Sequence, residues 1–356
     1  MIILAAASVM VCVFGAICEK GERRTLFLTV FTAAFAASNA LGGMCGLVGY
    51  ESTGWSYMYS IIDEIPFSSV GAPPAYILIM KICSAFSAEA WLPALVYACI
   101  RTAAAVCAAA LCSEKPYACG AVLISCFTPV FFAGAGSFTA ALICMCSSRY
   151  IRERRFVRFC TVILAAACFD ASVLLLIPLY LIFLIPIPAA AAGAAAVTAA
   201  LAALFPDACS AVFGIFGAGT FGSCTVPVAV AAAAVLAAVI ALIMYPMYKI
   251  RNGDPGRFVP VMCLGAAFSV TAIWDGRFFT PALCLLMVSM TALAPDTLAI
   301  LKRFAQILFP KKKKAAGMTV HIILALTVIA AGALLTFGNV FGAAEYNVSL
   351  GLEAFI

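Results

Sequence analysis

Charged residues are scarce in this chain: 21 basic and 15 acidic side chains among 356 residues, or 10% of the total. Soluble globular proteins carry about 25% charged and about 45–50% apolar residues, whereas 66% of this chain is hydrophobic. The shortage of charge excludes a soluble enzyme, a nucleic-acid-binding protein and a disordered protein. At roughly 20 residues per membrane span, the chain has room for about twelve helices. We therefore expect an all-α fold, a polytopic membrane helix bundle that forms one integral membrane domain over residues 1–356.

Histidine is almost absent, because His321 is the only one in the sequence. No Cys-x-x-Cys pair has histidine partners, so we expect no metal site, and no pattern indicates a cofactor. Most of the 17 cysteines fall in apolar stretches, where they are expected to act as small buried hydrophobic residues. Cys209 and Cys224 fall in one expected outer loop. They either form a disulfide bond there or remain as two free thiols, and the sequence leaves both alternatives open.

The apolar stretch at the N-terminus, residues 1–17, has no basic residues before it, which favours a first helix over a signal peptide. Further spans are expected where apolar windows are bounded by charge, Pro or Gly. They lie at about 25–42, 90–112, 117–132, 137–150, 157–169, 171–187, 189–206, 225–248, 258–274, 278–295 and 318–337.

The basic residues orient these spans, because cytoplasmic loops are enriched in Lys and Arg. Eighteen of the 21 fall in five connections: Lys20, Arg23 and Arg24; Lys115; Arg149, Arg152, Arg154, Arg155 and Arg158; Lys249, Arg251 and Arg257; and Lys302, Arg303 and Lys311 to Lys314. All five of these connections lie on the cytoplasmic side only if the apolar segment 74–87 does not cross the membrane. We therefore expect an interfacial helix there, and twelve crossings with both termini outside.

The opposite face is acidic. Only two basic residues, Lys81 and Arg277, are expected on this face. Its acidic residues are Glu51, Asp63, Glu64, Glu89, Asp170, Asp207, Asp275, Glu345 and Glu353. The expected outer parts include a loop over 43–89, which carries the interfacial helix, and a tail over 338–356. Any chemistry is expected on this outer side.

The first outer segment combines an acid with aromatic residues. Glu51 follows a membrane exit, and Trp55, Tyr57 and Tyr59 come next, before Tyr76. Such an acid can take a proton from an acceptor hydroxyl, and the rings can stack on sugars. The alternative is that the aromatic side chains only anchor the segment at the headgroup level and that Glu51 is a solvated loop charge.

Three further charged residues stand apart from the loops. Asp170 interrupts two apolar runs, and intramembrane acids are functional by default; the alternative is an acid at a helix N-terminus, stabilised by the helix dipole. Arg277 can hold a lipid phosphate through paired charge-assisted bonds, or can pair with Asp275 alone. Arg101 lies inside a span, and we expect it to have a structural partner within the bundle.

The stretch from Phe131 to Leu181 resembles the EpsG-type exopolysaccharide polymerase family, within the broader Wzy-like group. The frame matches without gaps. It reads Gly136-Ser137, Ala140 to Ser148, Tyr150-Ile151, Arg152 to Arg158, Phe169-Asp170, Ala171-Ser172 and Ile177-Pro178-Leu179-Tyr180. Elsewhere, three shorter matches resemble the family: Val48-Gly49-Tyr50-Glu51, Pro73-Pro74-Ala75-Tyr76 and Arg277. Gly136 and Asp170 stand where the family has an arginine and a histidine, and Ala72 replaces an acid before the proline.

The resemblance implies a bacterial cytoplasmic-membrane protein that transfers or polymerises sugar units from a polyprenyl-diphosphate-linked carrier at the outer face. Glu51 and Asp170 would be catalytic, and the substrate and its phosphate would be bound by Arg277, Lys81, Tyr76, Trp55 and Tyr59. The partners would be the lipid-linked sugar and membrane lipids, and no nucleic acid.

Two other functions remain open. The departures at Gly136 and Asp170 favour a non-catalytic relative, which keeps the fold and works with other polysaccharide-assembly proteins. A lipid-linked sugar flippase or transporter would need paired broken helices, for which the Gly-rich stretch 213–222 is the candidate. No internal repeat is visible, which weakens the transporter hypothesis.

Overall fold

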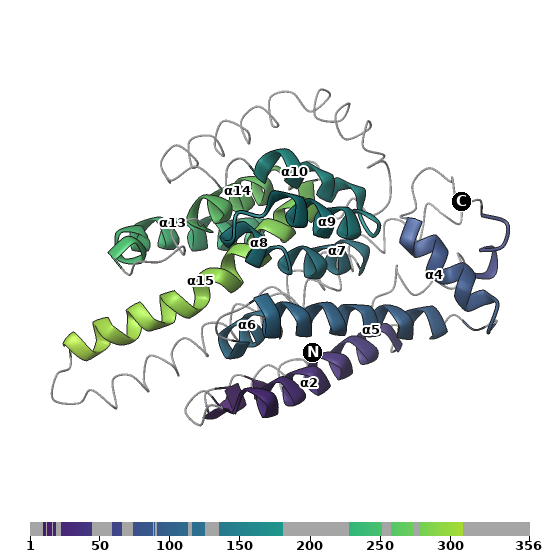
Figure 1. Cartoon of the computed structure of the whole chain (residues 1–356), viewed down its shortest axis with the longest axis horizontal. Helices are drawn as coiled ribbons and strands as arrows, with labels where there is room; N and C mark the ends of the chain where they lie inside the picture. Colours follow the sequence, from purple (N-terminus) through teal and green to yellow (C-terminus); the bar gives the residue numbers. More distant parts are fainter. Residues whose placement is uncertain are drawn as a thin grey trace.

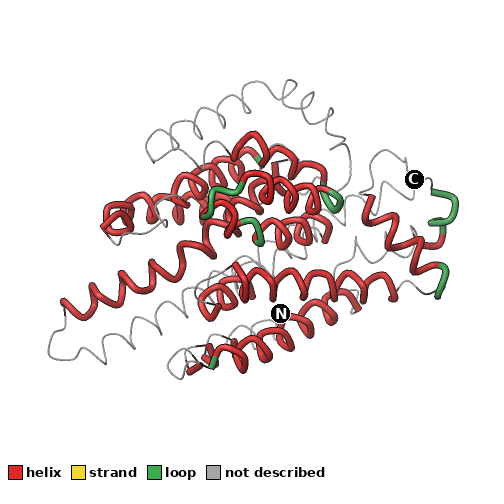
Figure 2. Tube along the Cα trace, viewed as in Figure 1, coloured by secondary structure: helices red, strands yellow, loops and turns green. Residues whose placement is uncertain are grey.

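The computed structural model describes a set of helices joined by short turns (Figure 2). The residues that it describes are 10–11, 13–15, 17–18, 23–44, 59–65, 74–87, 89, 91–112, 116–124, 135–180, 228–250, 258–272 and 278–308. Within these ranges the secondary structure consists of helices and the turns between them and includes no strand. The expected all-α fold is therefore confirmed for this part of the chain.

The helices follow one another in the order shown in Figure 1. They are α2 (Arg24–Met44), α4 (Pro74–Ser84), α5 (Trp91–Cys107), the π-helical turn η1 (Ala108–Cys112), α6 (Pro116–Val122), α7 (Ala135–Met145), α8 (Ser148–Arg152), α9 (Phe156–Ala167), the 3-10 helix η4 (Ala171–Leu175), α10 (Leu176–Leu179), α13 (Val228–Ile250), α14 (Phe258–Thr271) and α15 (Phe279–Leu308).

Two groups of helices make up the bundle. α2 packs along α5 and α6 on one side, while α7, α9, α13, α14 and α15 form the other side (Figure 1). α7 lies between the groups, because it contacts α5, α9 and α15. A continuous cluster of buried apolar side chains runs through both groups. Residues on α7 can therefore meet residues from both sides of the bundle.

One described helix is long and apolar enough to cross a membrane, judged by length and composition. It covers Trp91–Ala110, 20 residues, or about 30 Å at 1.5 Å per residue. α4 has only 11 residues, or about 16 Å, which is shorter than the hydrocarbon core of about 30 Å.

The helix expected at 278–295 is longer than the sequence suggested. α15 contains 30 residues and continues to Leu308. Its second half is fixed to α13, because the hydroxyls of Tyr248 and Thr297 share a hydrogen bond of 2.6 Å. Tyr248 is buried. This tertiary contact carries the helix past Pro295, where the sequence pattern predicted its end.

Glycine allows a close approach between α14 and α15. A Cβ atom added to Gly265 would lie 3.1 Å from the Cβ of Leu285, from the Cγ of Leu286 and from the backbone nitrogen of Leu286. The backbone nitrogen cannot move out of the way as a flexible side chain can. Gly265 therefore sets the distance between the two helices.

We predict that Gly265→Val lowers the apparent melting temperature of the protein in detergent, with a loss of about 1–3 kcal/mol from overpacking. Ala267→Val is the matched control, because Ala267 lies on the same helix and is only half-buried. Equal melting temperatures for the two variants would contradict the close contact at Gly265.

Candidate functional site

Asp170 lies at the N-cap of η4, directly after the turn that ends α9. Its Oδ1 atom accepts two hydrogen bonds from Ser172: one from the backbone N–H at 3.0 Å and one from the hydroxyl at 2.6 Å. A side-chain oxygen that accepts from the second residue of a helix is the usual capping arrangement. The alternative that placed Asp170 at a helix N-terminus is therefore correct as a description of its local structure.

The other carboxylate oxygen of Asp170 joins two distant helices. Its Oδ2 atom accepts from the hydroxyl of Ser137 on α7 at 3.0 Å and from the hydroxyl of Thr280 on α15 at 2.5 Å. The Ser137 and Thr280 hydroxyls are themselves 2.7 Å apart. The single proton of the Thr280 hydroxyl is shared between Asp170 and Ser137, and each carboxylate oxygen of Asp170 has two polar partners. Asp170 thus connects α7, η4 and α15.

Gly136 makes this connection possible. A Cβ atom added to Gly136 would lie 3.3 Å from the backbone oxygen of Phe169, which is closer than ordinary van der Waals contact. The N-terminal turn of α7 therefore approaches the end of α9 closely enough for Ser137 to reach Asp170. The two departures from the family pattern, Gly136 and Asp170, consequently lie side by side.

Three aromatic side chains form a chain of contacts that ends at Phe169, the residue before Asp170. The rings of Tyr76 and Tyr97 are 5.4 Å apart between centroids, and Tyr97 meets Phe169 edge-on at 6.1 Å. The backbone N–H of Ala75 donates to the oxygen of Cys168 at 3.0 Å, which ties the start of α4 to the end of α9. Tyr76, Phe169 and Asp170 are half-buried, whereas Tyr97 is fully buried. We refer to Tyr76, Ser137, Phe169, Asp170 and Thr280 as the Asp170 site.

Arg101 is buried beside this site, with 3% of its surface exposed. It lies near the middle of the helix Trp91–Ala110. Its Nε donates to the Thr139 hydroxyl of α7 at 2.8 Å, and its Cζ lies 5.8 Å from the centroid of the Tyr97 ring, close enough for a cation–π contact. The expected structural partner inside the bundle is thus supplied by Thr139 and Tyr97.

Two other predicted site residues lie on or against α4. Tyr59 is 5% exposed, and its hydroxyl donates to the backbone oxygen of Ser87 at 2.5 Å. It packs with Ile62, Ile77, Met80 and Cys83 in a small cluster separate from the main core. Burial, followed by the nearby Cys83 and Asp63, raises the pKa of Tyr59. Tyr59 therefore anchors residues 59–65 on α4. Lys81 lies on α4 and is half-buried.

The remaining sequence predictions lie outside the described residues. These are Glu51, Trp55, Tyr57, Arg277, His321, the cysteines Cys209 and Cys224, the Gly-rich stretch 213–222, the lysines at 311–314, the spans at 189–206 and 318–337, and the tail 338–356. Among the residues that are described, no group of three or more His, Cys, Asp or Glu side chains could hold a metal ion.

Sequence reasoning missed the hydroxyl groups that surround Asp170. Ser137 and Ser172 both lie within the stretch whose residues resemble the exopolysaccharide polymerase family, so that resemblance contained a weak signal for them. Thr280 carried no comparable signal, because its role depends on where α15 packs against α7. Comparisons of the chain with protein-family models, with curated proteins and with solved structures give no match.

We predict that Thr280→Val destabilises the protein by about 1–2 kcal/mol, because a half-buried carboxylate loses a hydrogen-bond donor while the side-chain shape is kept. Thr280→Ser keeps the hydroxyl and is expected to lose less. The measurement is the apparent melting temperature of the full chain in detergent.

The matched control is Thr291→Val on the same helix. The buried Thr291 hydroxyl donates only to carbonyl oxygens of its own helix, at Met287 and Val288, so its loss should change stability little. A Thr280→Val variant as stable as Thr291→Val would show that the bond to Asp170 contributes nothing.

Proposed function

We propose that this protein acts in bacterial surface-polysaccharide assembly and transfers or polymerises sugar units from a polyprenyl-diphosphate-linked carrier at the outer face of the cytoplasmic membrane. The observation that carries the proposal is the convergence of three separate stretches of the family frame. Gly136-Ser137, Phe169-Asp170 and Ala75-Tyr76 are far apart in sequence but meet at the Asp170 site. A chance match of short motifs would not be expected to bring them together.

The chemistry of the Asp170 site suits a sugar. A sugar hydroxyl is the same kind of donor as the Ser137 and Thr280 hydroxyls that now bond to Oδ2, so it can replace either of them at the carboxylate. Phe169, the residue before Asp170, and Tyr76 are half-buried and both contact Tyr97, so partly exposed aromatic surface belongs to the same region. A carboxylate beside aromatic rings binds both the hydroxyls and the apolar face of a sugar ring.

The proposed transfer needs a base and a cation. Glu51, with Asp170 as a second acid, takes the proton of the acceptor hydroxyl. At the same time the oxygen of that hydroxyl bonds to the anomeric carbon, and the bond from this carbon to the lipid diphosphate breaks. Arg277, with Lys81, neutralises the charge on the departing phosphate. Arg277 precedes Thr280 by three residues, so the chain keeps the two Cα atoms within about 11 Å of each other.

The membrane placement is part of the proposal: twelve crossings, both termini outside, and an interfacial helix at 74–87 in the outer loop. The helix Trp91–Ala110 supports it. So does α13, where large apolar side chains spaced along the helix are exposed: Val235, Leu236, Val239, Ile240, Ile243 and Met247. Lipid chains would cover such a surface, whereas water would not favour it.

A non-catalytic assembly partner is the second candidate, and one observation favours it. Both carboxylate oxygens of Asp170 accept hydrogen bonds from the chain itself, so the carboxylate connects α7, η4 and α15 without a substrate. In that case the protein keeps the fold and acts through other polysaccharide-assembly proteins.

Reconstitution in lipid vesicles with a lipid-linked oligosaccharide tests the proposal, with polymer length and yield as the measurement. We predict that Glu51→Gln and Arg277→Ala each lower product formation about a hundredfold. We expect Glu64→Gln, at an exposed outer acid, to leave it unchanged.

The outcomes separate the two candidates. Normal polymer from the Glu51 and Arg277 variants at equal protein levels would refute the residue assignment. If the purified wild-type protein makes no product but Asp170→Asn alters polymer length in cells, the non-catalytic function is correct instead.

A further inference from the structure

The turn between α8 and α9 has an unusual residue at its sharpest point. Arg154 has φ 54°, the left-handed conformation. The backbone N–H of Arg155 donates to the Tyr150 oxygen at 2.9 Å, and that of Arg154 to the Ile151 oxygen at 3.3 Å. This pair of bonds closes a helix in the Schellman arrangement, in which glycine usually occupies the left-handed position. An arginine there costs about 1 kcal/mol more than glycine, so the turn keeps a charge at the expense of local stability.

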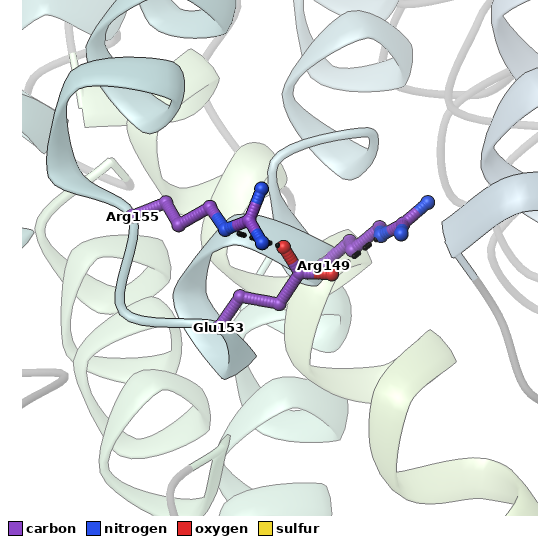
Figure 3. Close-up of polar contacts among 3 residues, drawn as sticks. All are labelled: Arg149, Glu153 and Arg155. Carbon is purple, nitrogen blue, oxygen red and sulfur yellow. Dashed lines mark hydrogen bonds and ion pairs between the residues drawn. The ribbon is translucent and has the colours of Figure 1, made fainter.

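Glu153 holds two arginines on opposite sides of its carboxylate (Figure 3). The Nε of Arg149 lies 2.6 Å from Oε1, and the Nε of Arg155 lies 2.9 Å from Oε2. The hydrogen bond from Arg149 lowers the pKa of Glu153 below its ordinary 4.5. The carboxylate is therefore ionised at neutral pH, and the arrangement is lost only as the pH falls through the lowered value.

The turn remains strongly basic in spite of Glu153. Residues 149–158 contain five arginines against one glutamate, and Arg154, Arg155 and Arg158 are exposed. Two large apolar side chains lie among them. Phe156 is 47% exposed and Val157 is 77% exposed. Basic and apolar side chains are thus exposed together on one short segment, residues 154–158, which we call the α8–α9 patch.

We propose that the α8–α9 patch binds the phosphate of an anionic phospholipid headgroup in the cytoplasmic leaflet. Guanidinium groups bind phosphate oxygens through charge-assisted hydrogen bonds, and the negative surface of that leaflet attracts basic segments. Phe156 and Val157 enter the boundary of the acyl chains. A free phosphate ion would leave this exposed apolar pair in water, so charge and apolarity together select a lipid. The inference rests on the membrane placement in the proposed function but not on the sugar chemistry.

The test uses the full chain purified in detergent, with phosphatidylglycerol or phosphatidylcholine added. Retained lipid is counted by native mass spectrometry, and the apparent melting temperature is measured in parallel. We expect preferential retention of phosphatidylglycerol. Arg155→Gln with Arg158→Gln should weaken its binding about twenty-fivefold, from roughly a fivefold loss for each basic residue removed.

The matched control is Arg23→Gln with Arg303→Gln, which removes the same charge at exposed positions elsewhere. An equal loss of phosphatidylglycerol in both double variants would overturn the proposal, because net charge alone would then explain the binding. Equal retention of the two lipids by the wild type would also overturn it. If the double glutamine variant does not fold, Arg155→Ser and Arg158→Ser made singly replace it, each with an expected fivefold loss.

Two further arms separate the source of the phosphate. Inorganic phosphate at the same concentration is expected to raise the melting temperature less than phosphatidylglycerol, and Phe156→Ser with Val157→Ser is expected to remove that difference. The second arm adds polyglutamate. If it raises the melting temperature as much as phosphatidylglycerol does, the partner is an acidic protein and the lipid site is refuted. Loss of lipid preference with normal polymer synthesis would leave the proposed function intact.

Discussion

The bundle depends on one requirement, that the half-buried carboxylate of Asp170 be satisfied. A carboxylate removed from water is costly unless hydrogen bonds replace its hydration. Here the replacement comes from Ser137, Ser172 and Thr280, which lie on three helices that are far apart in sequence. Because these donors must all reach one side chain, they fix how α7, η4 and α15 pack. The nearness of the Gly136 position to Phe169 is part of the same requirement.

A second polar contact lies on α7 only two residues farther along. Arg101 donates to Thr139, so the same helix carries a hydroxyl for a buried cation and a hydroxyl for a carboxylate. The ring of Tyr97 contacts both Arg101 and Phe169, the residue before Asp170. Buried charges of this kind cost stability, and a chain with so few charged residues is expected to keep them only for a reason. This is the physical reason why the proposed sugar site is assigned to this part of the described structure.

The two faces of the molecule use arginine differently. Inside the bundle, Arg101 is buried and contacts the uncharged side chains of Thr139 and Tyr97. At the α8–α9 turn, Glu153 holds Arg149 and Arg155 while most of the basic side chains stay exposed. The turn accepts a left-handed arginine, although glycine would be more stable there. The proposed lipid site accounts for this choice through the charge that the turn retains.

The sequence by itself determined the helical class and most helix positions, because long apolar windows bounded by charge leave few other structures. The helices at 24–44, 91–112, 228–250 and 258–271 begin and end within a few residues of the predicted windows. It also singled out Asp170, since a lone acid in an apolar stretch is conspicuous. Tertiary structure alone decided the partners of that acid and the extension of α15 to Leu308. Thr280 and Thr297 are ordinary residues in the sequence, and only the packing of distant helices brings their hydroxyls to Asp170 and Tyr248.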